Sequence, residues 1–269
     1  MTGNADILGV PPLSGGNAPL AGPRMRTLRQ RLRRKMLRLV RSTLGTITHV
    51  ETAQPVAALT FDDGPDPVTT PLVLDVLERH GAKATFFVLG KHATQHPQLV
   101  KRIAEAGHAV ANHSFDHTRF PSVGHRERIA QMEACEAAIA PYGCKLFRPP
   151  RGLQSARSRI DAFLLGYQVV TWNAVAQDWE LRDPAWTLER LESEIKPGSI
   201  VLLHDVLFDA DCDAAKDRQP MLAALDAFLA RNRRGLRYVT VPTLLAAGKP
   251  HKACWFVCSD ADWALHDPS

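Results

Sequence analysis

Cysteine is scarce in this sequence, and the few cysteines present form no obvious framework. Five occur in 269 residues, an odd number scattered along the chain: Cys135, Cys144, Cys212, Cys254 and Cys258. A chain of this length can bury a full hydrophobic core without covalent cross-links, so we expect reduced thiols rather than a disulfide scaffold. A metal site built on Cys254 and Cys258 is the alternative that remains.

Long hydrophobic runs are also missing. No segment approaches the roughly 18 consecutive apolar residues of a membrane-spanning helix. The positively charged region near the N-terminus is not followed by the apolar stretch of about 7 to 15 residues that a secretory signal needs. We therefore expect a cytoplasmic protein, unless translation starts at Met25 or Met36.

Positive charge is concentrated in one short segment. Residues 24–41 hold nine Lys or Arg and no acidic residue, so the net charge of +5 for the whole chain leaves −4 for the rest. This distribution argues against a nucleic-acid-binding body, and no nucleic-acid partner is expected. Apolar residues recur in the segment at steps of three or four, namely Met25, Leu28, Leu32, Met36 and Val40. Residues 24–44 are therefore predicted to form a basic amphipathic helix.

Two interpretations of this basic helix differ in what covers its apolar face. Cationic amphipathic helices are typical of segments that lie on an anionic membrane surface, which would place the protein at the inner face of the membrane. The alternative is a helix packed along the main domain with its arginines in solvent. Residues 1–23, with several Gly and Pro between Gly9 and Gly16, are predicted to be a disordered leader.

From Val56 onward, short apolar strands alternate with helices. Strands are predicted at 56–61, 84–89, 108–111, 145–147, 168–171, 199–203 and 237–240, and helices at 71–80, 97–106, 125–140, 155–165, 187–194 and 220–231. Such alternation implies an α/β fold with a parallel sheet, and closing that sheet gives an incomplete (β/α)7 barrel. Active sites of barrels lie at the C-terminal ends of the strands, so the residues after each strand are the candidates for function.

Two of these strand ends carry groups that bind metals. The first strand ends in Asp62 and Asp63, whose side chains point in opposite directions, so that one carboxylate can bind a metal while the other receives a proton. The third strand is followed by His113 and His117, which share a face if the loop between them is helical. A solvated turn and surface histidines are the alternatives for each segment alone. Together they supply a two-histidine, one-carboxylate set that leaves positions open for water and substrate.

Three further strand ends carry polar groups. Arg148 begins a stiff Arg-Pro-Pro-Arg-Gly loop, Asp178 and Trp179 lie in the loop after the fifth strand, and His204 ends the sixth. Taken singly, a salt-bridged arginine, a core tryptophan and a loop histidine explain them. All five polar segments, however, fall at the same end of successive strands, which favours a single active site.

These five segments, in this order, resemble the NodB-like polysaccharide deacetylases of carbohydrate esterase family four. The resemblance covers about residues 55–248 and rests on the strings Thr-Phe-Asp-Asp-Gly-Pro, His-Ser-x-x-His, Arg-Pro-Pro-x-Gly and Leu-Leu-His-Asp, which are specific in combination. We therefore expect a single deacetylase domain at 51–249, with a basic helix and linker at 24–50 before it and a tail at 250–269 after it.

The resemblance also implies a role for each polar residue of the site. One divalent metal, commonly zinc or cobalt, would be bound by Asp63, His113 and His117. Asp62 would be the base and His204 the acid, and we expect the two on opposite sides of the barrel mouth. Arg148 would orient Asp62, and Asp178 would pair with His204.

The substrate-binding residues implied by the resemblance include one that departs from the family pattern. Leu202 and Trp179 would line the pocket for the acetyl methyl group, and the backbone N–H of Arg151 would help to bind the oxyanion. Arg151 stands where the family usually has an aromatic residue, and Val175 replaces the first acid of the Asp-x-x-Asp-Trp motif. Our hypothesis is that Arg151 recruits an anionic feature of the substrate. The alternative is an arginine that points to solvent or pairs with a local acid.

The function implied is a metal-dependent hydrolase that removes an acetyl group from an N-acetylated amino sugar, carried on an oligosaccharide, a polysaccharide or a glycolipid. The sequence has no Gly-x-Ser-x-Gly elbow for a covalent acyl-enzyme. Two alternatives remain, because fold and site chemistry do not determine the substrate. One is an amidase of the same fold that acts on a non-sugar amide. The other is a catalytically silent carbohydrate-binding module, which the retained metal, base and acid groups disfavour.

Overall fold

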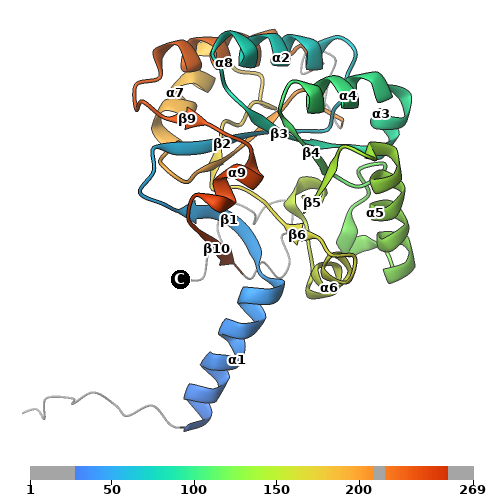
Figure 1. Ribbon diagram of the computed structural model, residues 1–269. Helices are drawn as coiled ribbons and strands as arrows, with labels where there is room; N and C mark the ends of the chain where they lie inside the picture. The colour runs from blue at the N-terminus through green and yellow to red at the C-terminus, as the bar shows by residue number, and fades with distance from the viewer. Residues whose placement is uncertain (1–27, 209–215, 254–269) are drawn as a thin grey trace, which may run out of the picture. The chain divides into compact units, whose positions relative to one another are not determined.

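The structure is a computed structural model that describes residues 28–208 and 216–253 (Figure 1). The chain divides into two units, Met1–Arg38 and Leu39–Ser269. The predicted leader, residues 24–27 of the predicted basic helix, and Cys212, Cys254 and Cys258 lie outside the described residues. No helix in the described part of the chain is long and apolar enough to cross a bilayer.

The main sheet has eight strands within the described residues, and all its neighbouring strands run parallel. Its path is β6-β5-β4-β3-β2-β8-β7, and β9 pairs with the beginning of β2. Since β6 and β7 stand at the two ends of this path, the sheet curls into a barrel that does not close, and the predicted incomplete (β/α)7 barrel is confirmed. The strands are β2 (Val56–Asp62), β3 (Ala84–Val88), β4 (Ala109–Asn112), β5 (Gly143–Phe147), β6 (Gln168–Val169), β7 (Ala174–Val175), β8 (Ile200–His204) and β9 (Arg237–Tyr238).

One strand of the barrel was placed wrongly by the sequence. The stretch 237–240 was predicted as the seventh strand, but β9 pairs only with Val56 and Ala57 at the beginning of β2. The seventh strand of the path is β7, which pairs with β8 and is too short to show a periodic pattern. As a result β8 lies directly beside β2, and Asp62 is the register partner of His204. The expectation that these two residues lie on opposite sides of the barrel mouth was therefore wrong.

The helices follow the strands as predicted, with small differences at their ends. Two short helices, α3 and α9, were not predicted, because six residues are too few to show a helical period. The helices are α1 (Leu28–Leu44), α2 (Thr69–Arg79), α3 (Gly90–Gln95), α4 (Pro97–Glu105), α5 (His125–Ile139), α6 (Ala156–Leu164), α7 (Pro184–Glu194), α8 (Gln219–Arg231) and α9 (Val241–Ala246).

A second, two-stranded sheet joins residues from the two ends of the described chain. Strand β1 (Thr46–Glu51) pairs antiparallel with β10 (Lys249–Ala253) (Figure 1). Ile47 and Val50 of β1 are buried, and Ile47 forms a bridge with Val170 next to β6. The stretches expected as a linker before residue 51 and as a tail after residue 249 therefore contribute strands to the folded unit. The β-branched residues of β1 favour a strand, but its partner becomes evident only when the two ends meet.

Alternation along the strands separates an inner and an outer cluster of apolar side chains. Leu59 and Phe86 belong to the outer cluster, which packs against helices such as α2 and α8. Ala58, Phe87 and Leu202 belong to the inner cluster. Because side chains alternate along a strand, Asp62 lies on the same face of β2 as Ala58, and His204 on the same face of β8 as Leu202. Both residues therefore face the interior of the barrel at its C-terminal end.

Candidate active site

The turn after β2 brings both of its carboxylates close to Nε2 of His113, so the opposite directions predicted for the two aspartates are not observed. Asp62 is the last residue of the strand, whereas Asp63 has a left-handed backbone with φ of 76°. The next residue, Gly64, has no room for a side chain, because a Cβ atom there would lie 2.1 Å from Oδ2 of Asp205. Asp205 also accepts hydrogen bonds from the Gly64 N–H and the Thr70 hydroxyl. A buried aspartate that sequence analysis left without a role therefore holds the turn that presents Asp63.

Asp63, His113 and His117 converge as predicted. One donor atom from each lies within 4.8 Å of the other two. The Oδ1 atom of Asp63 is 3.4 Å from Nε2 of His113 and 3.5 Å from Nε2 of His117. That oxygen is buried and has no hydrogen-bond partner in the described part of the chain. A buried carboxylate oxygen that faces two imidazole nitrogens and receives no proton is the arrangement expected where a cation belongs.

The protonation of these groups also fits a metal. The Nδ1–H of His113 donates to the backbone oxygen of Arg148 at 2.8 Å, which leaves the lone pair on Nε2. Burial raises the pKa of Asp63, but His113, His117 and His204 outweigh it and hold this pKa well below its usual range. The site therefore offers one carboxylate oxygen and two imidazole nitrogens, a donor set that suits zinc or cobalt.

The loop that carries the two histidines is not helical, so a shared helix face is not what brings them together. Ser114 and His117 have left-handed backbones, with φ of 72° and 66°. The side chain of Gln131 on α5 accepts hydrogen bonds from the N–H groups of Phe115 and Asp116. Tertiary contacts thus hold the loop in a conformation that costs local strain, and this conformation brings His117 to the site.

Asp62 is held by Arg148 inside the barrel. The Arg148 side chain is fully buried, and its guanidinium lies over the ring of Phe87 at 4.0 Å. It donates to Oδ1 of Asp62 at 2.7 Å, to the Thr60 hydroxyl at 2.7 Å and to the backbone oxygen of Thr171 at 2.8 Å. Oδ2 of Asp62 lies 3.7 Å from Nε2 of His113, on the side of the metal-type cluster. Arg148 therefore orients Asp62 as predicted and leaves one carboxylate oxygen facing the cluster.

His204 is held by Asp178, and a further arginine joins the pair. The Nδ1–H of His204 donates to Oδ1 of Asp178 at 3.0 Å. Burial lowers the pKa of His204, but Asp178 and the more distant Asp63 and Asp62 raise it, to about 9. Arg218 donates to Asp178 as well, and nothing in the sequence around Arg218 marks it as a site residue. Arg218 lies just before α8, forty residues from Asp178 in the sequence, and only the fold brings the two together.

The residues expected to contact the substrate occupy different parts of the site. The ring of Trp179 stands edge-on to that of His204, with centroids 5.6 Å apart. Leu202 is buried in the inner apolar cluster, against which Trp179 and Val175 also pack. Arg151 is exposed in a short turn after β5 and has a left-handed backbone with φ of 56°. The structure thus brings Trp179, Leu202 and Val175 into one apolar cluster. Val175, which replaces the acid of the Asp-x-x-Asp-Trp motif, therefore packs against apolar side chains.

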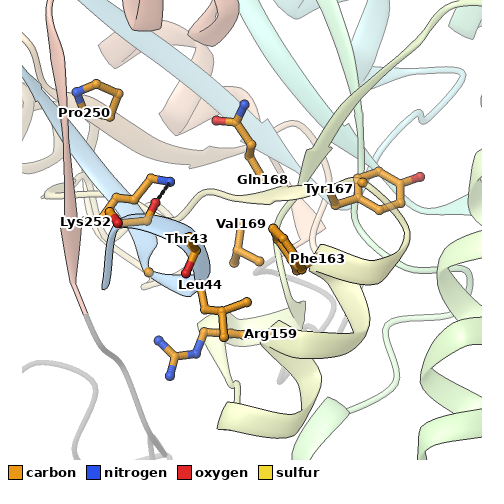
Figure 2. Close-up of a pocket in the computed structure, with 12 residues that line it drawn as sticks. Thr43, Leu44, Arg159, Phe163, Tyr167, Gln168, Val169, Pro250 and Lys252 are labelled. Atoms are coloured by element: carbon orange, nitrogen blue, oxygen red, sulfur yellow. Dashed lines mark hydrogen bonds between the residues drawn. The ribbon is translucent and has the colours of Figure 1, made fainter. Parts of the chain in front are cut away.

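A separate cavity of about 350 Å³ lies among the end of α1, helix α6 and strands β6 and β10 (Figure 2). The ammonium group of Lys252 donates to the backbone oxygen of Ser42 at its edge, at 2.7 Å. None of the residues that line it belongs to the strand-end cluster. The candidate active site is therefore the group of metal-binding side chains at the strand ends, and the cavity between α1 and α6 is a separate feature.

The model of a protein family described as polysaccharide deacetylase matches residues 49–170. A peptidoglycan-N-acetylglucosamine deacetylase of Bacillus cereus is 33% identical over 199 residues, which cover 72% of this chain and 70% of that protein. The chain belongs to the polysaccharide deacetylase family.

Other members of the polysaccharide deacetylase family agree with this assignment. A chitooligosaccharide deacetylase of Sinorhizobium fredii is 37% identical over 166 residues, 60% of this chain and 77% of that protein. The crystal structure of the Bc1960 peptidoglycan N-acetylglucosamine deacetylase, solved in complex with 4-naphthalen-1-yl-N-hydroxybenzamide, is similar with a TM-score of 0.71 and 29% identity. That likeness covers 80% of this chain and 99% of the other.

Proposed function

We propose that this chain is a metal-dependent hydrolase that removes the acetyl group from an N-acetylated amino sugar. The observation that carries the proposal is the buried Oδ1 atom of Asp63, which faces two imidazole nitrogens and has no hydrogen-bond partner in the described residues. A base held by Arg148 and an acid held by Asp178 lie beside this cluster, on the neighbouring strands β2 and β8. The relatives named for peptidoglycan N-acetylglucosamine and for chitooligosaccharides support an acetylated amino sugar as the substrate class.

The metal, zinc or cobalt, is held by Asp63, His113 and His117. When bound, it supplies a positive charge that polarises the acetyl carbonyl and lowers the pKa of a water. Of the two acids after β2, Asp63 is the ligand, because its Oδ1 atom faces both histidines.

Asp62 is the general base. Arg148 occupies its Oδ1 atom, so Oδ2, on the side of the cluster, removes a proton from the attacking water. The buried guanidinium keeps this carboxylate in one orientation, which is what a proton acceptor needs at a fixed distance from its water.

His204 is the general acid. Its pKa, raised to about 9, keeps the imidazole protonated at neutral pH. Its Nδ1–H is committed to Asp178, so Nε2 is the nitrogen that delivers a proton to the departing amine. The amine then leaves neutral, and acetate leaves with the oxygen of the water.

The remaining site residues shape the substrate pocket. Trp179 and Leu202 line the pocket for the acetyl methyl group, and the backbone N–H of Arg151 helps to bind the oxyanion. The Arg151 side chain, exposed where relatives usually present an aromatic sugar platform, attracts a carboxylate or phosphate on the substrate.

The decisive experiment compares acetate release from N-acetylglucosamine oligomers with acetate release from small cyclic and linear amides, using metal-loaded protein. We expect release from the sugars alone, and release slower by about 10²- to 10⁴-fold from the Asp62→Asn protein. Release from non-sugar amides only would identify an amidase. Sugar binding without turnover under any metal loading would identify a silent binding module.

We also propose that residues 24–44 hold the enzyme on an anionic membrane surface at the inner face of the membrane, so that the substrate includes an amphiphilic acetylated sugar. Within α1 the apolar side chains of Leu32, Met36 and Leu39 are 58%, 62% and 64% exposed. They recur at helical spacing in a segment with nine basic residues and no acidic ones. Each Lys or Arg near an anionic surface contributes about 1 kcal/mol, so the segment has enough charge to offset its own ordering.

Sedimentation with liposomes tests the membrane proposal. Binding is expected with anionic lipid only, it should weaken with salt, and it should vanish when residues 1–41 are deleted, a truncation that removes all nine basic residues and leaves β1 intact. Equal pelleting of the full-length and truncated proteins would contradict the proposal.

A further inference from the structure

A buried arginine outside all five sequence motifs contacts the proton donor and its partner. Arg218 precedes α8, and its side chain is 2% exposed, while that of Asp178 is 0% exposed. One guanidinium nitrogen donates to Oδ2 of Asp178 and to the backbone oxygen of His204, the latter at 3.1 Å. The other donates to the backbone oxygen of Asp178 at 2.8 Å. Arg218 therefore joins the loop after β7 to the end of β8.

We propose that Arg218 is a positioning residue for the proton donor His204 and acts on it through Asp178. Arg218 completes the hydrogen bonds of the Asp178 carboxylate and balances its charge. This inference rests on the proposed function, in which His204 protonates the leaving nitrogen.

The first part of the role is orientation. Oδ1 of Asp178 receives the Nδ1–H of His204 at 3.0 Å, and Oδ2 receives the backbone N–H of His204 at 2.9 Å together with the guanidinium of Arg218. Both oxygens are thus committed, and the carboxylate cannot rotate without breaking several bonds. A fixed carboxylate fixes the imidazole ring, which keeps Nε2 aimed at one position of the substrate.

The second part is electrostatic. Asp178, Asp63 and Asp62 raise the pKa of His204 and so favour its protonated form. Arg218 lowers the pKa of Asp178 and lies against the backbone oxygen of His204, so that its like charge is placed to oppose that form. Asp178 alone would hold the proton of His204 too tightly for rapid donation, because proton transfer is most efficient when the pKa of the donor lies near the working pH. By neutralising Asp178, Arg218 keeps the histidinium a stronger acid without removing the carboxylate that orients it.

The test uses three variants. Arg218→Met removes the charge and keeps much of the bulk, and Arg218→Lys keeps the charge and a donor. Arg128→Met is the matched control, because Arg128 forms a buried pair with Asp161 away from the strand-end cluster. The pKa of His204 is measured by NMR on histidine-labelled protein with equal zinc loading, and its signal is assigned with His204→Gln.

Arg218→Met is expected to raise the pKa of His204 by about one unit. It is also expected to lower kcat on N-acetylglucosamine oligomers about tenfold to a hundredfold with little change in KM, because the donor is affected and ground-state binding is not. Arg218→Lys should restore most of both values. Arg128→Met should lose stability but leave the pKa of His204 unchanged.

Two results overturn the inference: a folded Arg218→Met protein in which the pKa of His204 is unchanged or lower, or an Arg218→Lys protein no better than Arg218→Met. If Arg218→Met does not fold, the kcat of Asp178→Asn is compared with that of the double variant Asp178→Asn/Arg218→Met. Neither of these proteins contains a buried aspartate that has lost its arginine. A residue that acts only through Asp178 adds no further loss of kcat in that background, and an additional loss counts against the proposal. The NMR readout needs no substrate, so it separates failure of this inference from failure of the proposed function.

Discussion

The candidate site has two sides at which we propose proton transfer, and each contains a buried arginine–aspartate pair. The two pairs differ in how many oxygens of the aspartate are hydrogen-bonded. On the β2 side, Arg148 takes one oxygen of Asp62 and leaves the other toward the metal-type cluster. On the β8 side, His204 and Arg218 together occupy both oxygens of Asp178. A carboxylate with one oxygen uncommitted to its arginine can accept a proton, whereas one whose oxygens are both committed can only orient its neighbour. In the proposed mechanism, the same pair of residue types therefore makes a base in one place and a support for an acid in the other.

A third pair shows that burial of such a pair is not enough to make a site. Arg128 and Asp161 are also buried, and Arg128 donates to the backbone oxygen of Val123 as well. The exposed His125 ring bonds to the same aspartate, but the described residues place no metal-type cluster there. The other two pairs differ from this one in their contact with the ends of β2 and β8, because Asp62 ends β2 and Asp178 bonds to His204 at the end of β8.

Removing the metal, on which both the base and the acid depend, should give the largest loss of activity. Asp63→Asn and chelation of the wild-type protein are both expected to reduce acetate release to background, because the polarising charge and the activated water are lost together. Added zinc or cobalt should restore the chelated wild-type protein but not the variant. Acetate release after thorough demetallation is the measurement, and full activity there would falsify the metal assignment.

The different roles of the β2 side and the β8 side are tested most directly by removing the base and the acid separately. Asp62→Asn and His204→Ala should each lower kcat by about 10²- to 10⁴-fold while the metal content stays unchanged, because positioned proton acceptors and donors contribute about that much. Metal content is measured by elemental analysis of the same samples. Near-normal turnover in either variant shows that its residue does not have the assigned role.

The bond between Asp178 and His204 should also appear in the pH dependence of the free energy of unfolding. The pKa of His204 is raised from 6.5 to about 9 in the folded protein. A raised pKa stabilises the fold fully below about 6.5, and this contribution is lost as the pH rises through about 9. The free energy of unfolding should therefore fall over this window by on the order of 3 kcal/mol in metal-free wild-type protein.

His204→Gln is the control for that measurement, since it keeps a polar side chain that does not titrate. Urea unfolding at several pH values should give a flatter profile for this variant than for the wild type. Parallel profiles would mean that His204 does not carry the expected charge.

The smallest expected effect lies at the mouth of the site, away from both pairs. Arg151→Tyr should weaken kcat/KM for a substrate with a carboxylate or phosphate by a few-fold more than for a neutral one, because an exposed charge pair contributes about 0–1 kcal/mol. Kinetics with matched anionic and neutral acetylated sugars measure the difference. Equal changes for both substrates would show that the Arg151 side chain does not select for charge.

The strand ends were predictable because motifs and strands can be recognised locally. Asp62, Asp63 and His204 directly end or follow apolar stretches. Strand alternation did not separate the two aspartates, because Asp63 has a left-handed backbone and both carboxylates lie near Nε2 of His113. The loop from His113 to His117 was less predictable, since its left-handed residues depend on hydrogen bonds from a helix that follows later in the chain. Arg218 and Asp205 were missed, because an isolated polar residue carries no pattern until its partner is known.

The sequence by itself determined the α/β alternation, the order of the polar strand ends and the chemical types of the candidate metal ligands, base and acid. Each depends on residues close together in the chain, where period and turn chemistry can be read. Only the tertiary structure decided that β8 lies beside β2, that β1 pairs with β10, and that Arg218 reaches Asp178. These contacts join distant segments, and they form because the folded chain must pair strand edges and satisfy buried charges, wherever the partners lie in the sequence.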